Sequence, residues 1–421
     1  METLIWHSEK RKVKDLIPAS YNPRQISEIE RQDLMNSINE FGLVVPVVIN
    51  LDDKMIGGHQ RLGIYADLEI EEIDVQVPNR QLTLEEEMRL NVRLNKNTGS
   101  WDIEKLSQMD VDLLKDVGFG GDELSKMWDE MSVEENKSDI KKDIEKAKNT
   151  KIKNGEVYIL GEHRLMCGDS LSQDDVSKLM GGVKASMIYC DPPYNIGLNY
   201  SSGIGGHKDY SDSKLDDNKS KENYRQFLET TIIHAVANSK KDVHIFYWCD
   251  EKYIGMVQGI YENNCIENKR VCLWIKNNQN PTPQIAFNKV YEPCVYGTIG
   301  RPFLNKNYRA FNEVLNSEVG SGNQLIEDVL DLYNVWLIRR EASSDYEHPT
   351  QKPNKLHEKA LKRCSAPGDI ILDLFGGSGS TLMACDQLKR KAYLMETNPI
   401  FCQVIIDRWE QMTSLTAEKV I

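Results

Sequence analysis

Residues 367–396 carry the feature that most restricts how this chain can fold. Residues 370–374 form a short apolar run after a turn at Pro367, Gly368 and Asp369, and the run predicts a buried strand. A glycine-rich turn follows, then apolar residues at helical spacing, then a second strand at 391–395. A strand, a glycine turn, a helix and another strand build a βαβ unit, so we predict an α/β fold with a parallel sheet.

The glycine turn also indicates a ligand. Glycines 376, 377 and 379 permit positive φ angles and let a ligand approach the backbone closely. Glu396 ends the second strand about 20 residues further on, a position where an acidic side chain suits ribose hydroxyls. The glycine spacing departs from the dinucleotide pattern, and the turn alone leaves NAD, FAD or no ligand open.

A second stretch places chemistry at the end of another strand. Residues 186–190 read as a buried strand, and Asp191-Pro192-Pro193-Tyr194 stops it because proline cannot continue a ladder. The motif offers a carboxylate, stiffly held carbonyl acceptors and a flat ring. Such a set suits a planar aromatic ring that carries an amino group. The alternative is a proline-terminated strand followed by an ordinary turn.

Together these motifs resemble the amino-methyltransferases that modify exocyclic nitrogens of DNA bases with S-adenosylmethionine. The catalytic motif precedes the cofactor motif, which is similar to the β group with its circularly permuted, Rossmann-like sheet. Residues 161–170 and 348–353 are similar to two further motifs, and the resemblance spans about 153 to 412. It implies catalysis by Asp191, Pro192, Pro193 and Tyr194, and cofactor binding by Asp169, Thr350, Lys352, Asp373, Phe375, Gly376, Gly377, Gly379 and Glu396.

The first 80 residues predict a smaller α+β domain. A helical stripe covers 27–41, and strands are expected at 44–49 and 73–77. Asn22-Pro23-Arg24 and Gly58-His59-Gln60-Arg61 resemble the ParB N-terminal domain. The resemblance implies a phosphate site of Arg24, His59 and Arg61 at a helix N-terminus, binding CTP or another nucleotide. His-Gln-Arg replaces the Glu-Arg-Arg of many relatives, so a module that docks DNA or protein is the alternative, with His59 structural.

The remaining chain is divided by composition. We predict a helical extension over 81–131, a charged solvated linker over 132–154 and the methyltransferase domain over 155–421. The polar loop at 201–222 is expected to order on DNA. We expect target recognition at about 297–347, where four arginines are candidates for reading base edges: Arg301, Arg309, Arg339 and Arg340. The alternative is that these arginines belong to a solvated surface.

Composition limits the setting more than the function. The net charge of −13 over 421 residues argues against a uniformly basic coat, although a local patch suffices for phosphate contacts. The nine cysteines lack metal-ligand spacing, so no metal is expected, and no run reaches membrane length. We therefore expect a cytoplasmic, DNA-associated protein of a prokaryote or phage. Its expected partners are double-stranded DNA and a second copy of the chain, and no membrane is expected. No restriction nuclease motif is visible in the sequence.

Several functions stay open within this reading. By family habit, Asp at the first motif position favours adenine N6 over cytosine N4. A ParB-like DNA-binding protein with an inactive methyltransferase domain is the non-enzymatic alternative. RNA or protein glutamine is a weaker substrate class, because Asn-Pro-Pro-Tyr is more usual there. Both an orphan enzyme and a member of a restriction-modification system fit the sequence.

Overall fold

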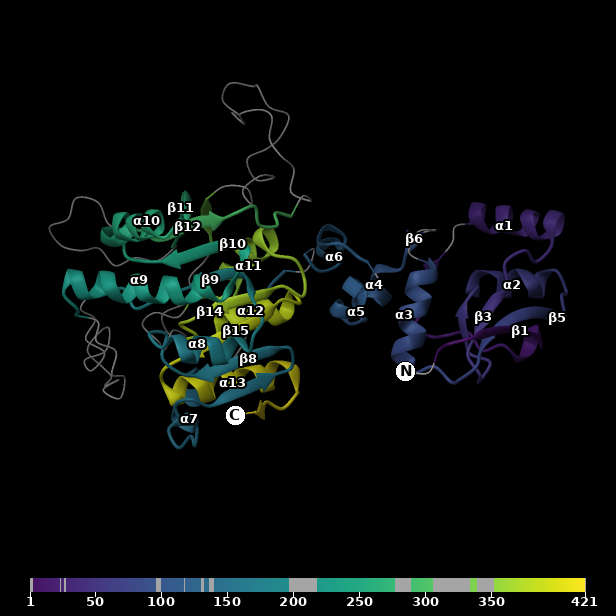
Figure 1. Ribbon diagram of the computed structural model, residues 1–421, viewed down its shortest axis with the longest axis horizontal. Helices are drawn as coiled ribbons and strands as arrows, with labels where there is room; N and C mark the ends of the chain where they lie inside the picture. The colour runs from purple at the N-terminus through teal and green to yellow at the C-terminus, as the bar shows by residue number, and fades with distance from the viewer. Residues whose placement is uncertain are drawn as a thin grey trace, which may run out of the picture. The chain divides into compact units, whose positions relative to one another are not determined.

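The computed structural model describes residues 3–22, 24–25, 28–95, 100–116, 118–129, 132–135, 140–196, 218–276, 289–305, 334–338 and 352–420. The chain forms two compact units, Met1–Met127 and Trp128–Ile421 (Figure 1). Each unit has its own sheet and core. In the described residues, none of the helices combines the length and the apolar character that a membrane span requires.

The first unit is built on a four-stranded sheet in the order β1-β5-β3-β4. Its strands are β1 (Trp6–Lys12), β3 (Val47–Ile49), β4 (Met55–Gly57) and β5 (Glu72–Pro78). Helices α1 (Glu28–Phe41) and α2 (His59–Asp67) accompany the sheet, and apolar residues such as Ile49, Ile64 and Val75 are fully buried between them. The predicted helix and the two predicted strands are therefore present.

Strand β1 has no counterpart in the sequence reading. It lies at the sheet edge, antiparallel to β5, and it alternates between half-buried and exposed residues. Charged edge strands are common because backbone pairing holds them while their side chains discourage pairing with other chains. A short 3-10 helix, η1 (Val13–Asp15), follows, and β2 (Arg24–Gln25) pairs with β6 (Ser100–Trp101) as a separate ribbon.

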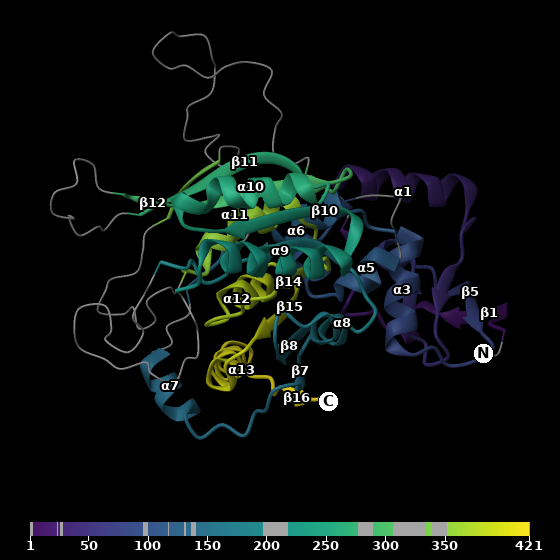
Figure 2. The same cartoon turned by 60° about the vertical axis from the view of Figure 1, so that its left-hand side comes forward.

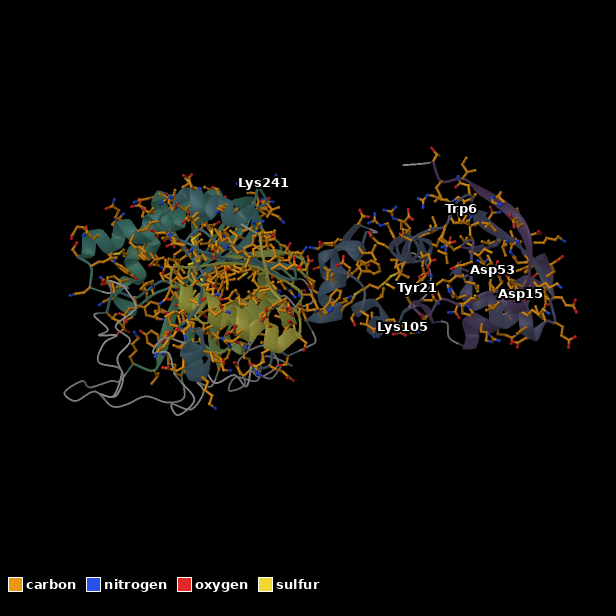
Figure 3. All side chains as sticks on the ribbon, turned by 90° about the horizontal axis from the view of Figure 1, so that it is seen from below. Trp6, Asp15, Tyr21, Asp53, Lys105 and Lys241 are labelled. Carbon is orange, nitrogen blue, oxygen red and sulfur yellow. The ribbon has the colours of Figure 1, made fainter. Side chains whose placement is uncertain are left out.

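Helix α3 (Leu84–Asn95), within the predicted helical extension, packs on β4 in the first unit. Asn91 Nδ2 donates to the carbonyl of Ile56 at 2.6 Å. Buried Glu87 accepts hydrogen bonds from Asn50 at 2.6 Å and from Tyr21, labelled in Figure 3, at 3.1 Å. Three short helices follow within the stretch predicted to be a helical extension: α4 (Ile103–Ser107), α5 (Val111–Asp116) and α6 (Gly121–Trp128).

The second unit contains a ten-stranded mixed sheet in the order β13-β11-β12-β10-β9-β14-β15-β8-β7-β16. Its centre is parallel: β8 (His163–Cys167), β9 (Ala185–Cys190), β10 (Ser239–Trp248), β14 (Ile370–Asp373) and β15 (Lys391–Glu396). Antiparallel neighbours extend it: β7 (Val157–Leu160), β11 (Glu267–Ile275), β12 (Tyr291–Ile299) and β16 (Glu418–Lys419), with the short β13 (Val335–Leu337) at one edge. The predicted α/β fold is confirmed.

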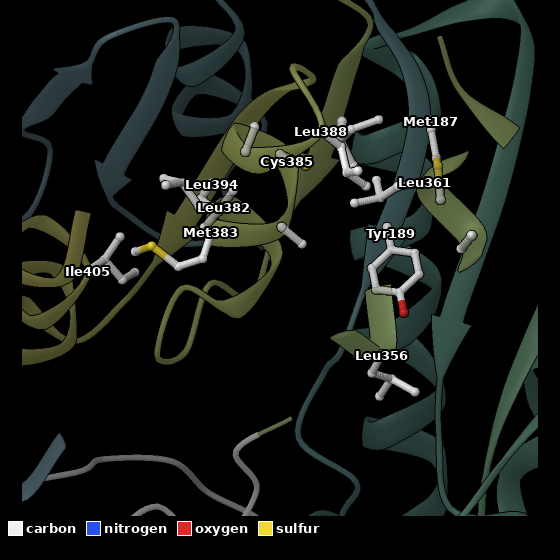
Figure 4. Packing of buried hydrophobic residues seen from close by; sticks show 14 of the residues in the cluster. Met187, Tyr189, Leu356, Leu361, Leu382, Met383, Cys385, Leu388, Leu394 and Ile405 are labelled. Carbon is white, nitrogen blue, oxygen red and sulfur yellow. The ribbon is translucent and has the colours of Figure 1, made fainter. Parts of the chain in front are cut away.

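Helices cover both faces of this sheet (Figure 2). One face packs against α11 (Lys355–Cys364), α12 (Ser380–Gln387) and α13 (Pro399–Thr413), and the other against α8 (Gln173–Met180), α9 (Lys221–Ala237) and α10 (Ile254–Asn263). The central strands alternate between the two cores: Met187 and Tyr189 face the first (Figure 4), and Ile188 faces the second. Because successive side chains point to opposite faces and both faces are buried, these strands are continuous apolar runs in the sequence.

The stretch from 132 to 154 differs from the predicted solvated linker. Val133 and Ile152 are buried in the core of the second unit, and helix α7 (Ile140–Ala147) packs against α13. Ile144 and Ala147 repeat at helical spacing and supply the apolar side of α7. A few apolar residues among many charges therefore suffice to dock this segment, and the expectation of a solvated linker is wrong for them.

Candidate active site

The geometry of the sheet brings the two sequence motifs together. Strands β9 and β14 are parallel neighbours, with Ile188 opposite Leu372, so their carboxyl ends meet at the same sheet edge. The chain leaves β9 toward α9 on one face and leaves β14 toward α12 on the other. Ligands of open α/β sheets bind where neighbouring strands diverge in this way. Asp191 follows β9, and Phe375 to Gly379 follow β14.

The Asp191–Tyr194 turn is fixed by contacts on both sides. Tyr194 Oη donates to Asp191 Oδ1 at 2.8 Å, and Tyr224 Oη donates to the Pro193 carbonyl at 2.8 Å. Asn195 follows with a positive φ of 53° and is buried. Its amide side chain donates to the Lys219 carbonyl at 3.0 Å and accepts from the Lys219 N–H at 2.6 Å. The carboxylate and the ring therefore have defined positions.

Lys352 reaches into this turn from the start of the C-terminal segment. Its Nζ lies 2.5 Å from Asp191 Oδ2, 2.8 Å from Tyr194 Oη and 3.5 Å from Glu292 Oε2. Lys276 forms a second ion pair with Glu292. These five side chains, Asp191, Tyr194, Lys276, Glu292 and Lys352, are called the charge cluster below. The cluster joins the end of β9 to β12 and to the residue after β11.

Burial and charge oppose each other in the cluster. Burial raises the pKa of Asp191, while the ammonium of Lys352 lowers it. For Glu292 burial acts in the same direction, but Lys352 and Lys276 outweigh it and bring its pKa to about 2. Burial alone would lower the pKa of Lys352, yet Asp191 and Glu292 raise it. The lysine is thus held as a cation beside a carboxylate that needs it to stay ionised.

In the glycine turn after β14, one glycine permits close helix packing and another leaves open space for a ligand. Gly379 has a φ of 82°, and a Cβ there would come within 3.0 Å of Ile405, so it allows α12 to pack closely on α13. Gly377 has a φ of 51°, and a Cβ there would meet nothing nearer than the Phe375 carbonyl at 4.0 Å. Gly376 is packed against the Met395 carbonyl. Open space at Gly377 is what a turn that receives a ligand requires.

Acidic side chains surround this turn. Glu396 Oε2 accepts from the Gly377 N–H at 2.8 Å, and Asp373 Oδ1 accepts from the Phe375 N–H at 3.0 Å. Burial raises the pKa of Asp373 to about 8 and also raises the pKa of Glu396. Asp169 is exposed two residues beyond β8, the strand next to β15. The carboxyl ends of β8, β15, β14 and β9 thus gather the cofactor-binding and catalytic residues expected from the sequence at one edge.

Other predicted residues lie outside the described part of the chain or away from this sheet edge. Thr350, Arg309, Arg339 and Arg340 lie outside the described residues, as does most of the predicted recognition segment and of the loop at 201–222. Arg301 is exposed after β12, and its backbone N–H donates to Asp242 at 2.8 Å. Trp274 is core: its ring is 1% exposed, and its Nε1 donates to the Ile338 carbonyl.

The motif of the first unit begins helix α2. His59 is the first helical residue, and its Nε2 accepts from the Ala19 N–H at 3.1 Å. Burial lowers the pKa of His59 to about 4, so the ring is neutral near pH 7 and serves a structural contact. Arg61 donates to the carbonyls of Val45 and Pro46. The Arg24 side chain lies outside the described side chains, and the phosphate site stays a prediction.

Two members of the charge cluster were missed as functional residues. Neither Glu292 nor Lys276 is among the functional residues that the sequence predicts. The available signal was a carboxylate within an otherwise apolar strand, residues 291–296, because a buried charge requires partners. The sequence did not say which lysines those partners are.

The fold and the site define an α/β protein with a carboxylate and an aromatic ring beside a glycine turn that can receive a ligand. A sequence model of the family described as DNA methylase matches residues 185–407, more than half of the chain. The chain therefore belongs to the DNA methylase family. A second family, described as the ParB N-terminal domain, matches residues 7–98, so the predicted ParB-like domain is confirmed and extends into α3.

Individual relatives are distant. Type II methyltransferase M.HpaI of Haemophilus parainfluenzae is 23% identical over 257 residues, which cover 59% of this chain and 74% of that protein. DNA adenine methyltransferase YhdJ of Escherichia coli (strain K12) is 24% identical over 265 residues, covering 60% and 84%. The crystal structure of the M1.HpyAVI-SAM complex is 20% identical, covers 58% of this chain and 97% of that chain, and has a TM-score of 0.42.

Proposed function

We propose that this chain is a site-specific DNA methyltransferase that methylates the exocyclic amino group of a base flipped out of double-stranded DNA, with adenine N6 as the target. The observation that carries the proposal is the position of Asp191 and Tyr194 at the divergence of β9 and β14, beside the open glycine turn. The DNA methylase family supports the reaction class. Asp at the first motif position and the relative described as a DNA adenine methyltransferase favour adenine.

The residues at the sheet edge fit S-adenosylmethionine. Gly377 offers room beside its backbone, and Glu396, Asp373 and Asp169 supply acceptors at the ends of three neighbouring strands. Thr350, Lys352, Phe375, Gly376 and Gly379 complete the set that the sequence predicts for the cofactor. When bound, S-adenosylmethionine supplies the methyl group on a positively charged sulfur.

The chain's own residues position and polarise the target. A base inside a duplex cannot reach the end of β9, so it must flip, at a cost of about a few kcal/mol. The Asp191 carboxylate accepts from the amino group of the flipped base, with the Pro192 carbonyl as second acceptor, and Tyr194 offers its ring for stacking. Orientation of the amino nitrogen supplies most of the rate, and the carboxylate stabilises positive charge that develops on it.

The test is methyl transfer from labelled S-adenosylmethionine to unmethylated DNA, followed by digestion to nucleosides and mass spectrometry. We expect N6-methyladenine from the wild-type chain. Asp191→Ala should lose activity by about a thousandfold or more, because an electrostatic contact to the reacting group disappears, while cofactor binding by calorimetry persists. Asp174→Ala, which removes an exposed carboxylate on α8, is the matched control with normal activity.

The other outcomes separate the alternatives. N4-methylcytosine as the product would keep the mechanism and contradict the assignment of adenine. Absence of product despite bound cofactor would favour a ParB-like DNA-binding protein with an inactive methyltransferase domain. Three further proposals come from the sequence: nucleotide binding at Arg24, His59 and Arg61, homodimer formation, and a cytoplasmic, DNA-associated location.

A further inference from the structure

Glu292 occupies a position that the methyltransferase motif does not explain. It lies on β12, which is antiparallel to β10 and is separated from β9 by that strand. Its side chain is 19% exposed, and its two oxygens engage different cations, Oε1 with Lys276 and Oε2 with Lys352. A carboxylate in such a place is costly unless its partners satisfy it, and here both partners are themselves largely buried, at 13% and 4% exposed.

The charge cluster balances to zero. Asp191 and Glu292 contribute two negative charges, and Lys352 and Lys276 contribute two positive charges. Aromatic rings complete the surroundings of the cations: the Lys352 ammonium lies 5.1 Å from the Tyr194 ring centroid and 5.0 Å from that of Trp248. The Lys276 ammonium lies 5.0 Å from the Trp274 ring centroid. Every contact of this kind restricts a flexible lysine.

Lys352 requires more than Asp191 to keep one position. Its ammonium has three protons, and the described acceptors around it are Asp191, Tyr194 and Glu292. Asp191 and Tyr194 belong to the same turn, so neither of them connects the ammonium to another element. Glu292 pulls from another strand, and Tyr194 Oη also lies 3.3 Å from its Oε2. The turn is thereby tied to β12 through both Lys352 and Tyr194.

We infer that Glu292 is a positioning residue for methyl transfer: it holds Lys352 against Asp191 and Tyr194, which fixes the orientation of the Asp191 carboxylate. The inference rests on the proposed function, because it assigns Asp191 the amino group of the base. Glu292 acts through Lys352 and Tyr194 and does not itself contact the base. Small displacements of a reacting group are expensive, so this support affects turnover more than binding.

The experiment compares three variants in steady-state methylation of unmethylated DNA. Glu292→Gln keeps the size of the side chain and removes its charge, and it should lower kcat by about tenfold to a hundredfold. The KM value for DNA should stay within about threefold of wild type. Glu292→Asp keeps the charge and should recover most of the lost kcat. Glu251→Gln is the matched control, since exposed Glu251 accepts from the neighbouring Tyr291 at 2.8 Å.

The outcomes are distinguishable from a failure of the proposed function. An inactive wild-type chain would overturn the proposed function and the inference with it. An active wild type with undiminished kcat in Glu292→Gln would overturn the inference alone. Equal losses in Glu292→Gln and Glu292→Asp, with the KM value for DNA raised, would assign Glu292 a structural role. Should Glu292→Gln not fold, the kcat of Glu292→Asp decides: a value at or below about one hundredth of wild type contradicts the inference.

Discussion

At the scale of single residues, Asp191 depends on Lys352 for its charge. Burial raises the pKa of Asp191, as does the carboxylate of Glu292, while Lys352 opposes both and Tyr194 donates a hydrogen bond. Only the ionised form of Asp191 carries the negative charge that stabilises the developing positive charge on the amino nitrogen, so activity falls as pH drops through its pKa. Lys352→Met removes the opposing cation, and the acid limb of kcat against pH should therefore move to higher pH. Activity at pH 7 should fall by about tenfold or more.

Lys352→Arg is the control for this pH profile, because it retains a cation near Asp191. Its acid limb should remain close to that of the wild-type chain, even if the larger guanidinium lowers kcat. An unchanged limb in Lys352→Met, measured over the same buffers, would contradict the role given to the ammonium. Stopped-time assays with labelled S-adenosylmethionine at saturating DNA give both profiles.

Residues differ in how far the sequence reveals them. Asp191, Tyr194, Gly377 and Glu396 were found because each belongs to a short motif whose spacing is local. Glu292 was not assigned its role, because its partner Lys352 is distant in the chain and only the fold brings it near. Lys276 enters the charge cluster through its ion pair with Glu292. His59 shows a further limit: the motif marks its position, but its contact with the Ala19 N–H requires coordinates.

At the scale of elements, the turn between β14 and α12 predicts that alanine at one glycine chiefly lowers stability and alanine at the other chiefly lowers cofactor affinity. Both have a positive φ, so alanine strains the backbone at either position. At Gly379 the new Cβ also meets Ile405, and Gly379→Ala should lower the free energy of unfolding by about 1–3 kcal/mol. At Gly377 the Cβ enters open space, so Gly377→Ala should chiefly weaken the binding of S-adenosylmethionine, by about tenfold.

Calorimetric titration with S-adenosylmethionine and thermal unfolding of the two glycine variants separate these effects. The ratio of affinity loss to stability loss should be larger for Gly377→Ala than for Gly379→Ala. The reverse ranking would mean that the open side of Gly377 does not face the cofactor.

The helices and strands were predictable where the spacing of apolar residues along the sequence was clear. The βαβ unit at 370–396 and the strand before Asp191 were predictable because buried parallel strands are short apolar runs beside glycine or proline. Strand β1 was not predicted, because an edge strand needs little burial. The packing of α7 was not predicted, because Ile144 and Ala147 are sparse among lysines and acids. The composition of such elements is dominated by their solvent-facing residues, so it does not reveal the few apolar residues that pack against the core.

At the scale of the whole molecule, the second unit begins earlier than the methyltransferase domain proposed from the sequence, which starts at residue 155. Arg390 is fully buried, and its guanidinium binds the Asp129 carboxylate at 2.6 and 3.3 Å and the Ser365 carbonyl at 2.7 Å. Asn305 also donates to Asp129 at 2.8 Å. Val133 N–H donates to Glu358 at 3.0 Å. The residues before 155 therefore satisfy groups within the sheet's own core.

The two boundaries can be compared directly by producing residues 128–421 and residues 155–421 and melting both. Loss of Asp129 leaves Arg390 buried without its carboxylate, which costs about 3–5 kcal/mol, and loss of Val133 and Ile152 uncovers apolar core. At about 2–4 °C per kcal/mol, the shorter piece should melt about 10 °C or more below the longer one. Asp129→Asn in the longer piece should reproduce only part of that difference, because α7 and its contacts remain. Equal melting temperatures for the two pieces would support the boundary at 155 and mean that the segment before it adds no stability. The expected drop in melting temperature would show that the second unit needs this segment to hold its sheet together.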